Sequence, residues 1–226
     1  MLRAGRFPAH RLDGAPHLVD AGRMVNTVFG ITLETRRSEI SSIGASRRAE
    51  LDALVEYLRE SFDEHVLLFV CTHNSRRSQF AQVWAWAAAR AFGFPSLRSE
   101  SGGTEATAFA PPAIEALRRC GFRIEVGEGE NPRVEIRINP EDDPLICWSK
   151  RFDAREDKSG FCAVMTCSSA DADCPIVPGS VARLSLNYED PKVSDGRRDE
   201  RAVYDERCAQ IAREMLYVFG HATHLL

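Results

Sequence analysis

A short loop after residue 70 carries the residue types that bind and attack a tetrahedral anion. Cys71 and Arg77 are separated by five residues, between an apolar strand pattern and the start of a helix pattern. A tight loop that enters a helix N-terminus turns backbone N–H groups inward and forms an anion-binding nest. We expect this nest to be lined by the loop residues Thr72, His73, Asn74, Ser75, Arg76, Arg77 and Ser78.

Three side chains of the loop are suited to nucleophilic chemistry. The Arg77 guanidinium offers parallel donors that match an oxyanion, and its charge favours the Cys71 thiolate, the nucleophilic form of cysteine. Ser78 can donate its hydroxyl proton to that thiolate, and Asn74 can hold the loop through side-chain hydrogen bonds. An isolated Cys-X5-Arg pattern is commonly a buried cysteine followed by solvated arginines. The strand–loop–helix context and a downstream Asp-Pro favour the catalytic interpretation.

Two further reactive residues follow predicted strands. Cys167 ends the apolar run 161–166, and Asp190 follows the run 182–186 and precedes Pro191. Proline restricts the residue before it, and a carboxyl held over an anion pocket can protonate a leaving oxygen. Asp-Pro by itself is also a common turn signal. Because parallel sheets bind ligands beyond the carboxyl ends of their strands, we expect Cys71, Cys167 and Asp190 at one edge.

Periodicity predicts a three-layer α/β fold with a central, mostly parallel, four-stranded sheet. The helices are expected at 47–63, from about 77, from about 111 to 121, and at about 199–219. The strands are expected at 65–70, 97–101, 161–166 and 182–186. Residues 122–149 alternate with period two around a turn and predict an inserted β-hairpin. The fold is also expected to carry an N-terminal helical extension, with residues 1–46 as a partly disordered N-terminal segment before a catalytic domain over 47–226.

Composition excludes several classes of protein. The 226 residues carry 29 basic and 33 acidic side chains, a net charge of −4, which argues against nucleic-acid binding held by charge. No apolar run approaches the roughly 18 residues of a membrane span. Seven cysteines without a secretory leader predict a protein of the reducing cytoplasm. Among these cysteines, Cys120 and Cys208 fall on apolar helix faces and are predicted to be core residues.

Cys174 lies seven residues after Cys167, and several interpretations of the pair are open. Both can be packed or unpartnered thiols, or they can join Cys147 and Cys162 in a zinc site, which the absence of a Cys-x2-Cys pair disfavours. If 168–174 is helical, the two cysteines are about 10 Å apart at 1.5 Å per residue. A disulfide tolerates a Cα separation of only about 4.4–6.8 Å, so forming one here requires the helix to unwind.

The loop VCTHNSRRS resembles the active-site loop of the low-molecular-weight protein tyrosine phosphatases and of the arsenate reductases that share their fold. SGGTEA (101–106), AIEALRRCGF (113–122) and YEDPK (188–192) resemble later segments of that family in the same order, so the resemblance covers roughly 65–219. TCSSADADCPIVP (166–178) resembles the redox segment of thioredoxin-coupled arsenate reductases, which plain tyrosine phosphatases lack.

This resemblance implies a thiol relay. Cys71 attacks arsenate while Asp190 assists the departure of an oxygen, and Cys167 then releases arsenite by forming a disulfide with Cys71. Cys174 takes over as the attacking thiol, and thioredoxin reduces the resulting Cys167–Cys174 disulfide. The implied occupants of the loop are arsenate, phosphate or sulfate, and the implied protein partner is thioredoxin, with no nucleic acid and no membrane.

The sequence also departs from the family pattern. His73 stands where glycine is usual, and Arg76 where a second cysteine or another small residue is common. Gln82 replaces an acid that helps hold a potassium ion in some arsenate reductases, so no cofactor is expected and a monovalent cation is disfavoured. Lys192 and Val193 follow the Asp-Pro where tyrosine phosphatases tend to carry aromatic residues.

Two other functions are open. The first is hydrolysis of phosphotyrosine through a phosphocysteine on Cys71, which needs Arg77 and Asp190 but not the later cysteines. The second is a non-catalytic phosphate-binding or interaction module, in which the N-terminal extension or the inserted hairpin engages a partner. A dependence on Cys167 separates the reductase from both.

Overall fold

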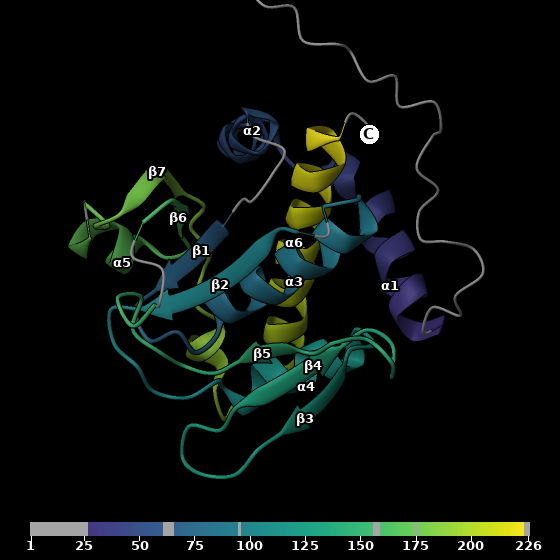
Figure 1. Ribbon diagram of the computed structural model, residues 1–226. Helices are drawn as coiled ribbons and strands as arrows, with labels where there is room; N and C mark the ends of the chain where they lie inside the picture. Colours follow the sequence, from purple (N-terminus) through teal and green to yellow (C-terminus); the bar gives the residue numbers. More distant parts are fainter. Residues whose placement is uncertain (1–26, 61–65, 95, 156–158, 175, 224–226) are drawn as a thin grey trace, which may run out of the picture.

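The computed structural model describes residues 27–60, 66–94, 96–155, 159–174 and 176–223. A four-stranded sheet lies at its centre, in the order β2-β1-β6-β7 (Figure 1). Every pair in it is parallel. The strands are β1 Val66–Cys71, β2 Arg98–Gly103, β6 Phe161–Met165 and β7 Ser180–Ser185. The predicted parallel α/β fold is thereby confirmed.

The buried position of β1 explains its continuous apolar sequence. All six of its residues are buried, because β2 and β6 pair with its two edges and helical layers cover its two faces. Leu67 and Phe69 point into the larger core, whereas Leu68 and Val70 point into the smaller one. Alternation along the strand therefore assigns its side chains to two separate apolar layers.

One face of the sheet carries the thick helical layer. α3 (Arg77–Ala91) contacts β1, β2 and α6 (Glu200–Ala222), and α2 (Ala45–Glu60) packs on α6 and β7. α3 is buried on nearly every side, which its alanine-rich sequence permits because small side chains allow close packing. The opposite face is covered by the short α5 (Ser168–Asp173), the buried Val177 and the partly buried Phe152. The cysteine at the end of β1 is thus approached from the thin side of the molecule by α5.

The stretch predicted as a partly disordered segment contains a helix. α1 (Thr27–Ser38) and the 3-10 turn η1 (Ile40–Ser42) precede α2, whereas residues 1–26 lie outside the described part of the chain. The α1 sequence has weak helical amphipathicity, and Phe29 is its one buried residue. The Phe29 ring lies 4.9 Å from that of Phe122 and 6.1 Å from that of Trp84. Phe29, together with the partly buried Leu33, packs this helix against the core, and the helix is also in contact with α6.

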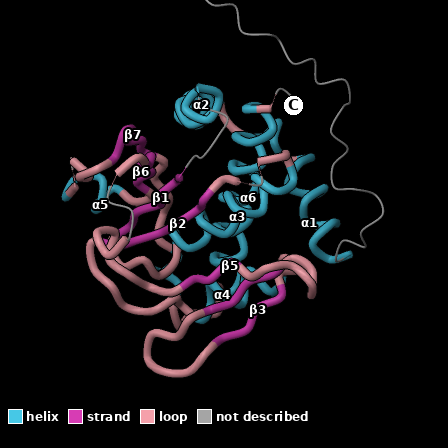
Figure 2. Tube along the Cα trace, viewed as in Figure 1, coloured by secondary structure: helices cyan, strands magenta, loops and turns pink. Residues whose placement is uncertain are grey.

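The predicted insertion is a small sheet of its own. β3 (Arg123–Val126) and β4 (Val134–Arg137) form the expected antiparallel hairpin, and β5 (Leu145–Cys147) adds a third strand beside β4. It follows α4 (Pro111–Arg119), with which β3 is in contact. Figure 2 shows the loops crowded at the side of the central sheet where β1 and β2 end. The chain leaving β5 enters this region, so the insertion reaches the candidate site.

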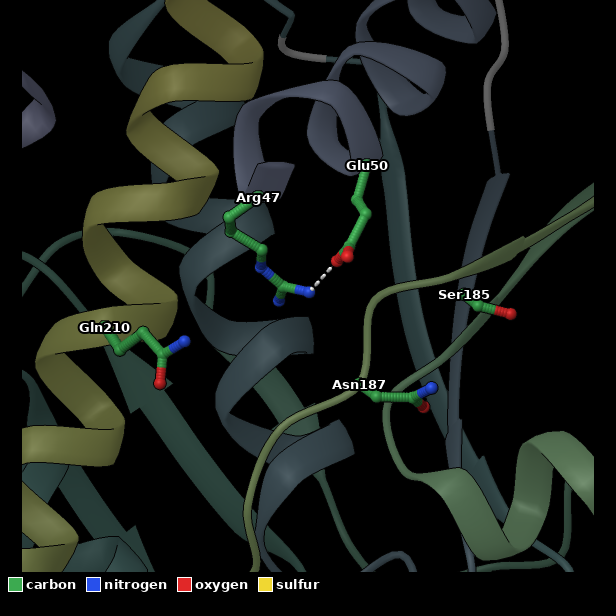
Figure 3. Close-up of a pocket in the computed structure, with 5 residues that line it drawn as sticks. All are labelled: Arg47, Glu50, Ser185, Asn187 and Gln210. Atoms are coloured by element: carbon green, nitrogen blue, oxygen red, sulfur yellow. Dashed lines mark hydrogen bonds and ion pairs between the residues drawn. The ribbon is translucent and has the colours of Figure 1, made fainter. Parts of the chain in front are cut away.

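A polar hollow of about 550 Å³ lies where α2 meets α6 and the segment after β7 (Figure 3). Arg47 of α2 pairs there with Glu50 at 2.6 Å and, deeper in, with the buried Glu214 of α6 at 2.7 Å. The guanidinium also lies 4.7 Å from the ring centroid of Tyr188, two residues before Asp190. The helix before the first strand therefore supports the segment that carries the candidate acid. No helix among the described residues is long and apolar enough to cross a bilayer.

Leu54→Ala tests whether α2 is an integral part of the domain. Leu54 is fully buried in the larger core, so truncation should lower the free energy of unfolding by about 2–5 kcal/mol. Glu56→Ala on the exposed face of the same helix should cost less than about 0.5 kcal/mol. Urea denaturation of both variants measures this, and equal small losses would mean that α2 is not part of the cooperative unit.

Candidate active site

Cys71 is the last residue of β1, and its sulfur lies 3.0 Å from the hydroxyl oxygen of Ser78. The side-chain amide of Asn74 donates to that same hydroxyl oxygen at 2.9 Å. Since the amide occupies the acceptor side of the hydroxyl, the hydroxyl proton is available to the sulfur. This is the arrangement that an activated cysteine nucleophile needs. The predicted roles of Ser78 and Asn74 have a geometric basis in these two contacts.

Asn74 holds the loop in a backbone conformation that most residues avoid. Its φ is 47°, in the left-handed region that asparagine tolerates better than other non-glycine residues. The residue is fully buried, and its side-chain oxygen accepts from the backbone N–H of Lys150 at 2.9 Å. Its carbonyl oxygen accepts from the side chain of Gln79 at 3.0 Å. One asparagine therefore ties the loop to α3 and to the chain that leaves the inserted sheet.

The segment after β2 braces the loop from the other side. The backbone N–H of Glu105 donates to the carbonyl of Thr72 at 2.8 Å. A Cβ atom on Gly103 would lie 2.6 Å from the same carbonyl oxygen and 2.8 Å from the nitrogen of Asn74. Only glycine fits at this point. Sequence reasoning matched this stretch to the family without finding its role, because the close approach exists only in three dimensions.

Arg77 and Asp190 meet across the mouth of the loop. Arg77 donates to a carboxylate oxygen of Asp190 at 2.7 Å and to the carbonyl of Tyr188 at 3.2 Å. The other Asp190 oxygen accepts from the backbone N–H of Lys192 at 3.1 Å and caps the 3-10 turn η2 (Pro191–Ser194). One guanidinium nitrogen of Arg77 therefore meets the carboxylate and the other meets a backbone carbonyl, so that Arg77 and Asp190, the two residues predicted to act on an oxyanion, are in direct contact.

The side chains of Arg76 and His73 each have a partner outside the loop, and the assignment of both residues to oxyanion binding stays a prediction. Arg76 donates to the hydroxyl of Tyr204 at 2.5 Å and to Asp195 at 2.7 Å. The His73 ring lies 3.6 Å from the carboxylate of Glu105. Both residues also line the hollow beside the loop.

Cys167 lies against the loop from the next strand. Its sulfur is fully buried and 3.6 Å from the hydroxyl oxygen of Thr72, the residue after Cys71. The backbone N–H of Ala170 points to the same sulfur at 3.4 Å, so Cys167 caps α5. The structure therefore brings Cys71, Arg77, Asp190 and Cys167 to one edge of the sheet, as expected.

Cys174 stands apart from that group. It follows the last residue of α5, is half-buried, and its carbonyl accepts from Arg183 at 3.1 Å. The intervening helix separates it from Cys167 by about 10 Å at 1.5 Å per residue. No disulfide links the seven cysteines. Burial raises the pKa of the Cys147 and Cys162 thiols to about 12.

Gln82 binds β2 to α3 with both ends of its amide. Its nitrogen donates to the carbonyl of Ser99 at 3.2 Å, and its oxygen accepts from the Ser101 hydroxyl at 2.5 Å. The side chain is buried, at 3% exposure, and its oxygen accepts the Ser101 hydrogen bond inside the protein.

A hollow of about 360 Å³ opens beside the loop, lined in part by Lys192, Thr107 and Pro111.

Fold and site together define a parallel α/β protein in which a cysteine-bearing loop is built to hold an oxyanion. Arsenate reductase 2 of Staphylococcus epidermidis is 30% identical to this chain over 133 residues, which cover 57% of the chain and 80% of that protein. An arsenate reductase of Bacillus subtilis is 25% identical over 145 residues, covering 64% and 87%. The chain belongs to the arsenate reductase family.

A solved structure gives a weaker likeness. A low-molecular-weight phosphotyrosine phosphatase of Vibrio cholerae superposes with a TM-score of 0.46 at 16% identity, covering 69% of this chain and 94% of its own. No protein-family model matches the chain.

Arg77→Lys and Arg76→Lys should have opposite outcomes. Replacing Arg77 removes a charge-assisted hydrogen bond worth about 1.5–3 kcal/mol, so phosphate and arsenate should bind roughly ten- to hundredfold more weakly. Arg76→Lys should change binding less than about threefold, because that guanidinium is directed at Tyr204 and Asp195. Calorimetric titration with each anion measures both. Equal losses of affinity in the two variants would mean that the Arg76 side chain also binds the anion.

Proposed function

We propose that this protein reduces arsenate to arsenite through a relay of Cys71, Cys167 and Cys174, with thioredoxin as the external reductant. The position of Cys167 supports the proposal above all: a second cysteine sulfur lies buried against the anion loop, 3.6 Å from the Thr72 hydroxyl. The names of the relatives agree with arsenate as the substrate. A relay that starts from free thiols fits the reducing cytoplasm.

The first step joins sulfur to arsenic. The Cys71 thiolate attacks the arsenic atom, and one As–O bond breaks as Asp190 passes a proton to the departing oxygen. The Ser78 hydroxyl, 3.0 Å from the sulfur, holds the thiolate before attack. Arg77 and the backbone N–H groups of the loop neutralise the charge on the remaining oxygens.

The second step reduces arsenic. Cys167 attacks the Cys71 sulfur, and the S–As bond breaks with its electron pair moving to arsenic. Pentavalent arsenic leaves as arsenite, and the two sulfurs are left as a disulfide. Thr72 borders both cysteines, being next to Cys71 in the chain and in contact with the Cys167 sulfur. Its hydroxyl is placed to donate to Cys167 as a thiolate.

The third step moves the disulfide outward. Cys174 attacks the Cys167 sulfur, which frees Cys71 and leaves a Cys167–Cys174 disulfide for a thioredoxin dithiol to reduce. In the reduced protein α5 keeps the two apart, held by Asp171, which accepts from Arg183, Ser185 and Asn187. Burial alone would raise the pKa of Asp171, but these bonds outweigh it and lower the pKa. The third step therefore requires α5 to leave its anchor and unwind.

Hydrolysis of phosphomonoesters is the second candidate activity, and the hollow beside the loop favours it. Its volume of about 360 Å³ leaves room for an organic group next to the nest. Hydrolysis would use Cys71, Arg77 and Asp190 and would replace the attack of Cys167 by that of water. The two activities therefore differ in their need for the second cysteine.

Cys167→Ser should abolish arsenate turnover supported by thioredoxin, thioredoxin reductase and NADPH, because the S–As bond then has no attacking thiol. Cys174→Ser should release about one arsenite per protein molecule and then stop, with a Cys71–Cys167 disulfide visible by mass spectrometry. Cys120→Ser, distant from the loop, is the matched control and should turn over normally. The phosphatase would be established instead if the wild type did not reduce arsenate and if both the wild type and Cys167→Ser hydrolysed an aryl phosphate. Anion binding without either activity would establish the binding module.

Amide hydrogen exchange should report the unwinding of α5. In the reduced protein the backbone N–H of Cys174 donates to the carbonyl of Ala170 at 3.0 Å. The backbone N–H of Asp171 donates to the carbonyl of Cys167 at 2.9 Å, so both amides should be protected from exchange. In protein oxidised by arsenate, these amides should exchange at least about tenfold faster, because the helix cannot persist across the disulfide. The amides of β1 serve as the unchanged reference. Equal protection of α5 in both states would contradict the third step.

A further inference from the structure

Cys120 and Cys208 form a second pair of thiols, far from the relay in sequence and used by no step of the proposed reaction. Cys120 follows the last residue of α4, and Cys208 lies in the middle of α6. Their sulfurs are 3.7 Å apart, although the two residues are 88 positions apart along the chain. Sequence reasoning treated both as separate core residues, whereas the structure places them in hydrogen-bonding contact. We propose that this pair is a redox modification site, which a hydroperoxide converts to a disulfide joining α4 to α6.

The surroundings give the two sulfurs different parts in the reaction. Cys208 is fully buried, and the Trp84 indole N–H donates to its sulfur at 3.2 Å, whereas Cys120 is partly exposed. A small oxidant therefore reaches Cys120 first. The hydrogen bond with Cys208, helped by the charges of Arg36 and Arg119, lowers the pKa of Cys120, although burial opposes this. Cys120 is the attacking thiol and Cys208 the resolving one.

The local backbone allows the sulfurs to approach from 3.7 Å to the roughly 2.05 Å of a disulfide. Cys120 stands where α4 ends, and Gly121 follows with a φ of 96°, so the attacking residue lies in a turn. Cys208 lies in a helix and stays in place. A direct S–S bond also needs no added volume in this packed region, unlike a bridging metal or arsenic atom.

The proposed oxidation balances with one peroxide. The Cys120 thiolate attacks a peroxide oxygen, the O–O bond breaks, and water leaves with the thiol proton, so that Cys120 becomes a sulfenic acid. The Cys208 sulfur then attacks the Cys120 sulfur, the S–O bond breaks, and a second water leaves with the Cys208 proton. Two thiols lose two electrons, and hydrogen peroxide gains them. None of these steps depends on the arsenate chemistry.

The test uses the full-length chain with the relay removed by Cys71→Ser, Cys167→Ser and Cys174→Ser, which leaves four of the seven cysteines. After reduction and removal of the reductant, one to three equivalents of hydrogen peroxide are added, followed by alkylation and peptide mapping. We expect two of the four thiols to disappear, a peptide cross-linked through Cys120 and Cys208, and Cys147 and Cys162 still alkylated. The melting temperature should rise by about 5–10 °C, reversibly with dithiothreitol, because the bond closes a long loop.

Cys120→Ser in the same background is the matched control and should show neither the cross-link nor the rise. The wild-type chain without arsenate, mapped in the same way, should show the Cys120–Cys208 peptide as well, so that folding of the variants does not decide the result. In the triple variant, cross-links through Cys147 or Cys162 in place of the Cys120–Cys208 peptide would overturn the proposal. So would oxidation of Cys120 to a sulfinic acid while Cys208 stays a free thiol.

Discussion

The parallel pairing of β1 with β6 is the constraint on which the site depends. Val70 is in register with Met165, so the two strands end side by side and their next residues turn out of the sheet together. The carbonyl of Val70 accepts from the Thr166 backbone at 2.7 Å and extends this pairing past the last residue of β6. Cys71 and Cys167 therefore leave adjacent strand ends, and a thiol relay between them needs no large movement of the domain.

The loop that follows Cys71 is held in place by contacts with residues outside it. Asn74 is buried and hydrogen-bonded to Gln79 and Lys150. Gly103 of β2 lies close to the loop backbone, and the hydroxyl of Ser149 donates to the carbonyl of His73 at 2.9 Å. Rigid donors aimed at an anion cost little reorganisation when charge develops on it. By contrast, α5 is a six-residue helix anchored mainly through Asp171. The loop after β1 is thus held by several neighbouring segments, whereas α5 is held mainly through one side chain.

Much of this arrangement was predictable from short-range pattern. Continuous apolar runs identified β1 and β6, and the cysteine–arginine spacing before a helix identified the loop, because both features are local in the chain. The partners of the Arg76 side chain were not predictable, because Asp195 and Tyr204 lie more than a hundred residues away in the sequence. α1 was missed for a related reason: its one buried residue, Phe29, makes its contacts with Trp84 and Phe122 rather than within a periodic face.

Consecutive residues were sufficient to predict the four strands of the central sheet, the helices that flank them and the similarity of the loop after Cys71 to one family, because each of these is a local pattern. Tertiary structure alone decided which sulfurs meet. Seven cysteines allow many pairings, and only packing places Cys167 beside Thr72 and Cys120 beside Cys208. Contacts between residues far apart in the sequence depend on how the helices and strands pack together. That packing is determined by many residues throughout the core, not by the residues next to either cysteine.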